Sequence, residues 1–79
     1  MKYRKKPVVI EAFRWKGELR FPDWAEKVVN VSNDLLVVPT LEGDMTASPG
    51  DWVIKGVEGE IYPCKDSIFR ATYEAVEEQ

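Results

Sequence analysis

Two closely spaced turn signals constrain the fold of this chain more than any other feature of its sequence. In residues 48–51 (Ser-Pro-Gly-Asp), Pro49 fixes φ at the first central position and Gly50 accepts a positive φ at the second, which suits a type II turn. A second turn signal, residues 56–59 (Gly-Val-Glu-Gly), follows the short apolar run of residues 52–54. Turns this close together predict strands of only a few residues each.

The segment around these turns is expected to fold as a hairpin followed by a short helix. The first strand should cover residues 51–55, and the return strand should cover residues 60–62. Pro63 cannot donate to a ladder, so we expect it at the end of the strand or on a sheet edge. The helix that follows should run through Phe69.

The remainder of the chain contains further short apolar segments separated by turn residues. Residues 8–15 predict a strand that is apolar on both faces, residues 21–29 an amphipathic helix with Trp24 in the core, and residues 35–38 a strand ended by Pro39. A tight turn at residues 42–43 predicts one more small hairpin. The sequence therefore predicts an α+β fold, with about five short strands in a small, strongly twisted antiparallel sheet or partial barrel and two short helices.

A chain of 79 residues suits a single domain, which we place at residues 1–79. Residues 1–6 form a basic N-terminal arm, and residues 75–79 form an acidic tail that is expected to fray. The 44% of hydrophobic residues and the nine aromatic side chains (three each of Trp, Tyr and Phe) are sufficient for a compact core.

The sequence lacks the residues on which most catalytic and metal sites depend. It contains no histidine and a single cysteine, which excludes an intrachain disulfide and the usual zinc sites. Cys64 is either a thiol with a lowered pKa beside Lys65 or a small buried apolar residue, and we favour the second interpretation. Without a signal peptide or an apolar run of ~20 residues, a soluble protein in a reducing cytoplasm is expected, with neither enzymatic activity nor a cofactor.

Charge is divided unevenly along the chain. Residues 1–20 carry seven cations and two acids, a net charge of +5, whereas residues 21–79 carry four cations and twelve acids, a net charge of −8; the two sum to −3. This asymmetry predicts electrostatic steering of a partner, or contact between the positive strand of one subunit and the acidic face of another. Together with a strand that is apolar on both faces, it favours a homo-oligomer, either a dimer or a small ring.

Glu11 and the cations near the N-terminus each allow more than one interpretation. Glu11 lies within an apolar run, and we interpret it as a carboxylate at a sheet edge; the alternative is a carboxylate at a site mouth, held by Arg14 or Lys55.

The cations of residues 2–16 alternate with aromatic residues, which is typical of single-stranded nucleic-acid binding. A net charge of −3 and a pI near 4.9 argue against nucleic acid as the partner.

The C-terminal half resembles a family of small uncharacterised proteins of bacteriophages and prophages. The shared pattern, PGDWxIxGxxGExYPCK…IFxxTYE, lies here at residues 49–52, 56–60, 62–65, 68–69 and 72–74, and residues 3–12 are also similar to the beginnings of such proteins. The resemblance leaves about residues 16–41 uncovered. It implies a phage origin and a location in the host cytoplasm, without implying a particular chemistry.

Small phage proteins without catalytic residues act mainly by occupying a target, so two functional hypotheses follow. In the first, the protein is an oligomeric binding module (a sponge) for an anionic nucleotide-type signalling molecule of host defence. In the second, it inhibits a host defence enzyme through its acidic surface. The residues expected to bind an anion are Arg14, Trp15, Lys55, Tyr62, Lys65 and Arg70, because few cations occur beyond residue 20 and Lys65 precedes the last helix.

Overall fold

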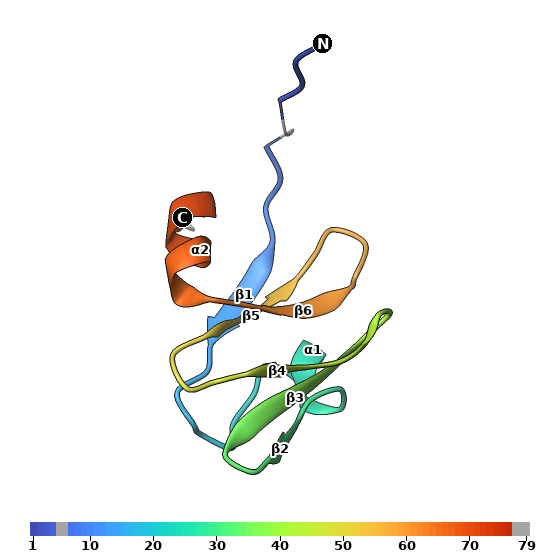
Figure 1. Ribbon diagram of the computed structural model, residues 1–79, viewed down its shortest axis with the longest axis vertical. Helices are drawn as coiled ribbons and strands as arrows, with labels where there is room; N and C mark the ends of the chain where they lie inside the picture. The colour runs from blue at the N-terminus through green and yellow to red at the C-terminus, as the bar shows by residue number, and fades with distance from the viewer. Residues whose placement is uncertain (5–6, 77–79) are drawn as a thin grey trace.

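The computed structural model describes residues 1–4 and 7–76, and these form two three-stranded antiparallel sheets and two short helices (Figure 1). One sheet has the strand order β1-β5-β6 and the other β2-β3-β4, and β6 packs against β3 and β4. The elements are β1 (Glu11–Arg14), α1 (Asp23–Glu26), β2 (Asn30–Ser32), β3 (Leu35–Thr40), β4 (Gly43–Ala47), β5 (Trp52–Lys55), β6 (Ile61–Cys64) and α2 (Asp66–Thr72).

The predicted α+β class, the antiparallel pairing and the two short helices are confirmed. The prediction of one sheet or partial barrel with about five strands is wrong, because the described residues form six strands in two sheets that do not close into a barrel. The strand that the sequence analysis missed is β2, which begins at Asn30, where the predicted helix was expected to end. The helix itself is shorter than predicted and covers only Asp23–Glu26.

The extra strand depends on a turn at Asn33 and Asp34. Both residues have positive φ, 53° and 62°, a backbone conformation that Asn and Asp tolerate better than other non-glycine residues. Consecutive residues of this kind close a two-residue hairpin with the right twist, so β2 folds back on β3 with Ser32 opposite Leu35. The chain therefore turns into a second sheet where a longer helix was predicted.

The two turns that organise the C-terminal half form as predicted. Gly50 has φ of 100°, and the Asp51 N–H donates to the Ser48 carbonyl at 2.9 Å, as a type II turn requires. Between β5 and β6, the Gly59 N–H donates to the Gly56 carbonyl at 3.0 Å. Pro63 lies in β6, an edge strand, where its missing N–H is tolerated.

Aliphatic side chains from both sheets and one tryptophan form the core. Leu36, Val38 and Val53 are fully buried, and Trp15, which follows β1, is only 1% exposed. Trp24 is half-buried and contacts the ring of Phe13 at the border of this core. The core therefore holds the two sheets together face to face.

Strand β1 is shorter than predicted, because its partner strand β5 ends at Lys55. Glu11 lies opposite Lys55, the last residue of β5, so residues 7–10 have no strand to pair with. These residues continue away from both sheets toward the N-terminus (Figure 1). Val8 and Val9 remain exposed, at 46% and 75%.

Replacing Gly50 by valine should destabilise the fold, since a β-branched residue is strongly disfavoured at φ of 100°. We expect the melting temperature of Gly50→Val to fall by about 4–8 °C or more, the shift that corresponds to a loss of about 1 kcal/mol in a domain of this size. The matched control is Thr46→Val, which places the same residue at an exposed position of β4. Melting of both variants within about 2 °C of the parent would contradict the strain at Gly50.

Candidate functional site

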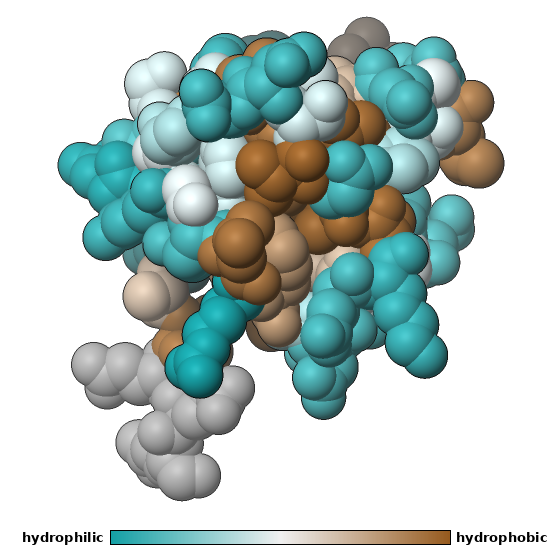
Figure 2. Space-filling model, turned by 90° about the horizontal axis from the view of Figure 1, so that it is seen from below, coloured by the Kyte–Doolittle hydropathy of each residue, from teal (hydrophilic) through white to brown (hydrophobic). Residues whose placement is uncertain are grey.

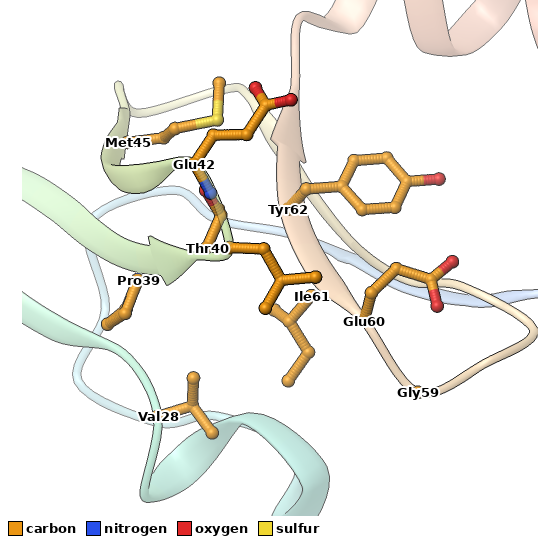
Figure 3. A pocket seen from close by; sticks show the side chains of 10 residues that line it. Val28, Pro39, Thr40, Glu42, Met45, Gly59, Glu60, Ile61 and Tyr62 are labelled. Carbon is orange, nitrogen blue, oxygen red and sulfur yellow. The ribbon is translucent and has the colours of Figure 1, made fainter.

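A groove of about 610 Å³ lies where the β3–β4 hairpin faces β6 (Figure 3). Val28, which follows α1, closes one end, and its side chain points toward that of Ile61. The carboxylates of Glu42 and Glu60 lie away from this pair. The apolar lining consists of Val28, Pro39, Leu41, Met45, Ile61 and Tyr62.

Several of these apolar side chains are exposed to solvent. Leu41 is 102% exposed, Met45 44% and Val28 37%, although large apolar side chains of a small domain are normally needed in its core. Figure 2 shows hydrophobic side chains lying together at the surface between hydrophilic ones. Apolar side chains that gather in a groove indicate a binding surface more strongly than single exposed ones do.

The β3–β4 turn holds Leu41 in this exposed position. The Thr40 hydroxyl donates to the Gly43 carbonyl at 2.7 Å and accepts from the Glu42 N–H at 3.2 Å. These two hydrogen bonds close a turn that consists of Leu41 and Glu42, and both side chains are exposed there. The turn thus places one apolar and one acidic side chain next to each other at the groove.

The second carboxylate is fixed by the β5–β6 turn. The Glu60 side chain accepts a hydrogen bond from the Glu58 N–H at 3.1 Å and lies over Gly56. A Cβ atom at position 56 would collide with the Glu60 carboxylate, so a larger residue there would require the flexible Glu60 side chain to move. Glu42 and Glu60 are the charged residues of the groove lining, which contains no lysine or arginine among the described residues.

Tyr62 lies where the groove approaches the end of α2. Its ring points away from Ile61 (Figure 3). Burial, and then a hydrogen bond with Tyr73, raise the pKa of Tyr62 to about 12. The hydroxyl therefore stays neutral at physiological pH and adds no charge to the groove. The structure leaves the Tyr62 side chain half-buried.

The residues predicted to bind an anion lie outside the groove, except for Tyr62, and the four cations among them are already paired with carboxylates. Arg14 and Arg70 both contact Asp66, at 3.6 and 3.1 Å. Lys65 lies 3.2 Å from Asp51, and Lys55 lies 3.8 Å from Glu11. Trp15 belongs to the core. The structure thus brings Arg14 and Arg70 together at Asp66.

Asp66 is the centre of the most connected of these clusters. Its carboxylate accepts hydrogen bonds from the Trp52 indole N–H at 2.9 Å and from Arg70 at 3.1 Å. The hydrogen bond from Trp52, together with those from the arginine and the nearby positive charges, lowers the pKa of Asp66 below its ordinary value. The Trp52 ring also stacks on Phe69, with centroids 3.9 Å apart. These contacts attach α2 to the β1-β5-β6 sheet.

The sequence allowed two interpretations each for Cys64 and Glu11, one structural and one functional, and the structure shows what surrounds both side chains. Cys64 is half-buried, and burial followed by the nearby negative charge of Asp51 raises the pKa of its thiol, the opposite of an activated cysteine. Glu11 is an exposed carboxylate on β1, the edge strand of its sheet, and it pairs with Lys55. Both arrangements agree with the structural interpretations that we favoured.

The described residues contain neither a cluster of three or more potential metal ligands nor a helix long and apolar enough to cross a membrane. No family model, no curated protein and no solved structure matches this chain.

Sequence reasoning did not find the groove, because its walls come from three separate segments of the chain. One usable signal was Leu41, an aliphatic residue directly before the predicted turn at residues 42–43. The spacing of Asp66 and Arg70 by four residues on a helix was a signal for their ion pair.

Asp66→Asn provides a test of the ion cluster, because it keeps an oxygen that can accept from Trp52 and removes the charge. A carboxylate whose pKa is lowered by folding adds stability above its unfolded pKa of about 3.9, and this stability is lost as the pH falls through the folded-state pKa. We therefore expect a lower melting temperature for Asp66→Asn at pH 7, and a difference from the parent that shrinks as the pH falls below the unfolded pKa.

The control for this measurement is Asp44→Asn, which changes an exposed aspartate on β4. A melting-temperature difference between Asp66→Asn and the parent that is the same at pH 7 and pH 3 would contradict the assigned role of the charge.

Proposed function

We propose that this protein acts by binding rather than by catalysis, and that the groove between its two sheets docks a basic, partly apolar segment of a partner protein. The observation that carries this proposal is the composition of the groove, in which exposed apolar side chains lie beside Glu42 and Glu60 and no cation is present among the described lining residues. Apolar contacts supply affinity in such a surface, and the carboxylates steer and select a positively charged partner.

The strands that border the groove favour an extended partner segment. Met45 belongs to β4 and Ile61 belongs to β6, and each of these strands lies at the edge of its own sheet. Edge strands present unpaired N–H and C=O groups, with which an extended segment can form a further ladder. Main-chain pairing of this kind would add affinity to the side-chain contacts in the groove.

The charge of the chain supports the same class of partner. Residues 21–79, which contain the whole groove, have a net charge of −8. The resemblance of the C-terminal pattern to small bacteriophage and prophage proteins supports a host protein as the target, and a host defence enzyme fits the expected role of such a binding protein. The protein would then act in the host cytoplasm by covering a basic surface of that enzyme.

Binding of synthetic peptides tests this proposal directly. The probes are extended peptides of about ten residues in which Lys or Arg alternates with Leu, Val or Tyr, and their counterparts with Glu in place of the cations. We expect fluorescence anisotropy to show binding of the basic peptides and not of the acidic ones. Leu41→Asp should weaken this binding about fivefold or more, since loss of a central apolar contact costs above about 1 kcal/mol.

The matched control is Leu19→Asp, because Leu19 is also a well-exposed leucine, at 78%, and lies outside the groove lining. It should bind the peptides as the parent does. Absence of binding at high micromolar peptide, or an equal loss in the two variants, would overturn the groove as the docking site.

An anionic nucleotide-type ligand is the second candidate, and one observation favours it. Arg14 and Arg70 converge next to the stacked rings of Trp52 and Phe69, a combination that suits a phosphate and a base. An anion bound there would have to displace the Asp66 carboxylate. Because of this energetic cost, we rank a nucleotide ligand below a basic partner segment.

Calorimetric titration with mono-, di- and cyclic nucleotides separates the two candidates. Because the cations are already neutralised by carboxylates, we expect no heat of binding at high micromolar nucleotide. Binding that disappears in the double variant Lys65→Ala, Arg70→Ala would instead place the nucleotide candidate first.

A further inference from the structure

The beginning of the chain is an extended arm that carries its own apolar and cationic side chains into solvent. Residues 1–4 and 7–10 form neither helix nor strand, and they lead away from both sheets (Figure 1). Tyr3 is 87% exposed and Met1 103%. Lys2 and Arg4 flank Tyr3 in the sequence, so an aromatic side chain lies between two positive charges.

The chemistry of this arm complements that of the groove. The groove offers Val28, Leu41 and Met45 as exposed apolar contacts, with carboxylates from Glu42 and Glu60 beside them. Residues 1–10 contain four cations (at positions 2, 4, 5 and 6) and no acid. An extended, basic segment with an exposed aromatic residue is the kind of occupant for which we have argued from the groove alone.

In the structure, residues 1–4 of the same molecule lie away from this groove (Figure 1). The arm continues from the start of β1 away from the β3–β4 hairpin, whose turn forms one wall of the groove (Figure 1). A second copy of this chain therefore provides the groove that the arm can enter.

We propose that residues 1–4 of one copy occupy the groove of a second copy, which returns its own arm in the same way. This inference rests on the proposed function, because it uses the same groove, and it names the first occupant of that groove. Reciprocal exchange forms a closed, two-fold dimer, in which the positive arm of each subunit meets the acidic face of the other. Such a dimer covers Leu41 and Met45, which are exposed in the single chain.

The arrangement also makes partner binding and self-association compete. A basic segment of another protein must displace the arm before it can enter the groove, so target binding should release monomers. The apparent affinity for the target then falls as the protein concentration rises, because more grooves are occupied by arms.

Sedimentation of the full chain at tens of micromolar, with variants of the arm, tests this assembly. We expect the parent to be a dimer. Tyr3→Ser should dissociate it, and Arg4→Glu should weaken the dimer by up to about fivefold for each arm, the upper end for the loss of one exposed ion pair. The matched control for Tyr3→Ser is Leu19→Ser, which removes another well-exposed apolar side chain and should leave the dimer intact.

A charge exchange within one chain supplies the sharper test. Glu42→Lys alone should weaken the dimer as Arg4→Glu does, and the double variant Arg4→Glu, Glu42→Lys should recover most of the loss, because the attraction is restored with reversed signs. Glu74→Lys, an exposed carboxylate outside this groove, is the control and should not rescue Arg4→Glu. Dimers of the parent should also weaken as the salt concentration rises.

The outcomes separate this inference from the proposed function. A parent chain that is monomeric at tens of micromolar, or a dimer that is indifferent to Tyr3→Ser and Arg4→Glu, overturns the arm exchange; if basic peptides still bind the groove, the proposed function stands. A dimer that depends on both the arm and Glu42, together with a monomeric Arg4→Glu variant whose free groove binds no basic peptide, supports the arm exchange and overturns the proposed function.

Discussion

A pair of backbone hydrogen bonds between the end of β1 and the type II turn is the contact on which the rest of the structure depends. The Gly50 N–H donates to the Trp15 carbonyl at 2.6 Å, and the Trp15 N–H donates to the Asp51 carbonyl at 2.9 Å. The turn lies between β4 of one sheet and β5 of the other, so these bonds fix the point where the chain crosses between sheets. The Asp51 side chain, only 12% exposed, supports the turn by accepting from the Ser48 N–H and pairing with Lys65.

This junction explains which parts of the fold could be predicted from the sequence. The turns around Gly50 and Gly59 were predicted correctly because their residue preferences act over four residues and need no distant partner. The division into two sheets was not predictable in the same way, since it depends on how β6 packs against β3 and β4. Asn30 was assigned to a helix end for a related reason: its strand exists only because Asn33 and Asp34 turn the chain back onto β3.

The side-chain contacts of the candidate site could not be predicted from local sequence patterns either. Cations were correctly identified as scarce beyond residue 20, but their partners are carboxylates that only the fold brings near. Asp51 and Lys65 are fourteen residues apart and form an ion pair. Arg14 reaches Asp66 because β1 and β5 pair and α2 begins directly after β6. The groove combines a residue after α1, a hairpin turn and an edge strand, and no local pattern connects these three segments.

The placement of the groove across the two sheets has a consequence for the folding of the protein. An occupant that contacts Leu41 on one side and Ile61 on the other bridges the β2-β3-β4 sheet and the β1-β5-β6 sheet. Any opening between the sheets would separate these two walls and release the occupant. If the proposed docking occurs, the occupant would hold the two sheets of this small domain together, and part of the free energy of binding would become resistance to unfolding. In such a molecule, an occupied groove would add to the contacts that hold the two sheets together.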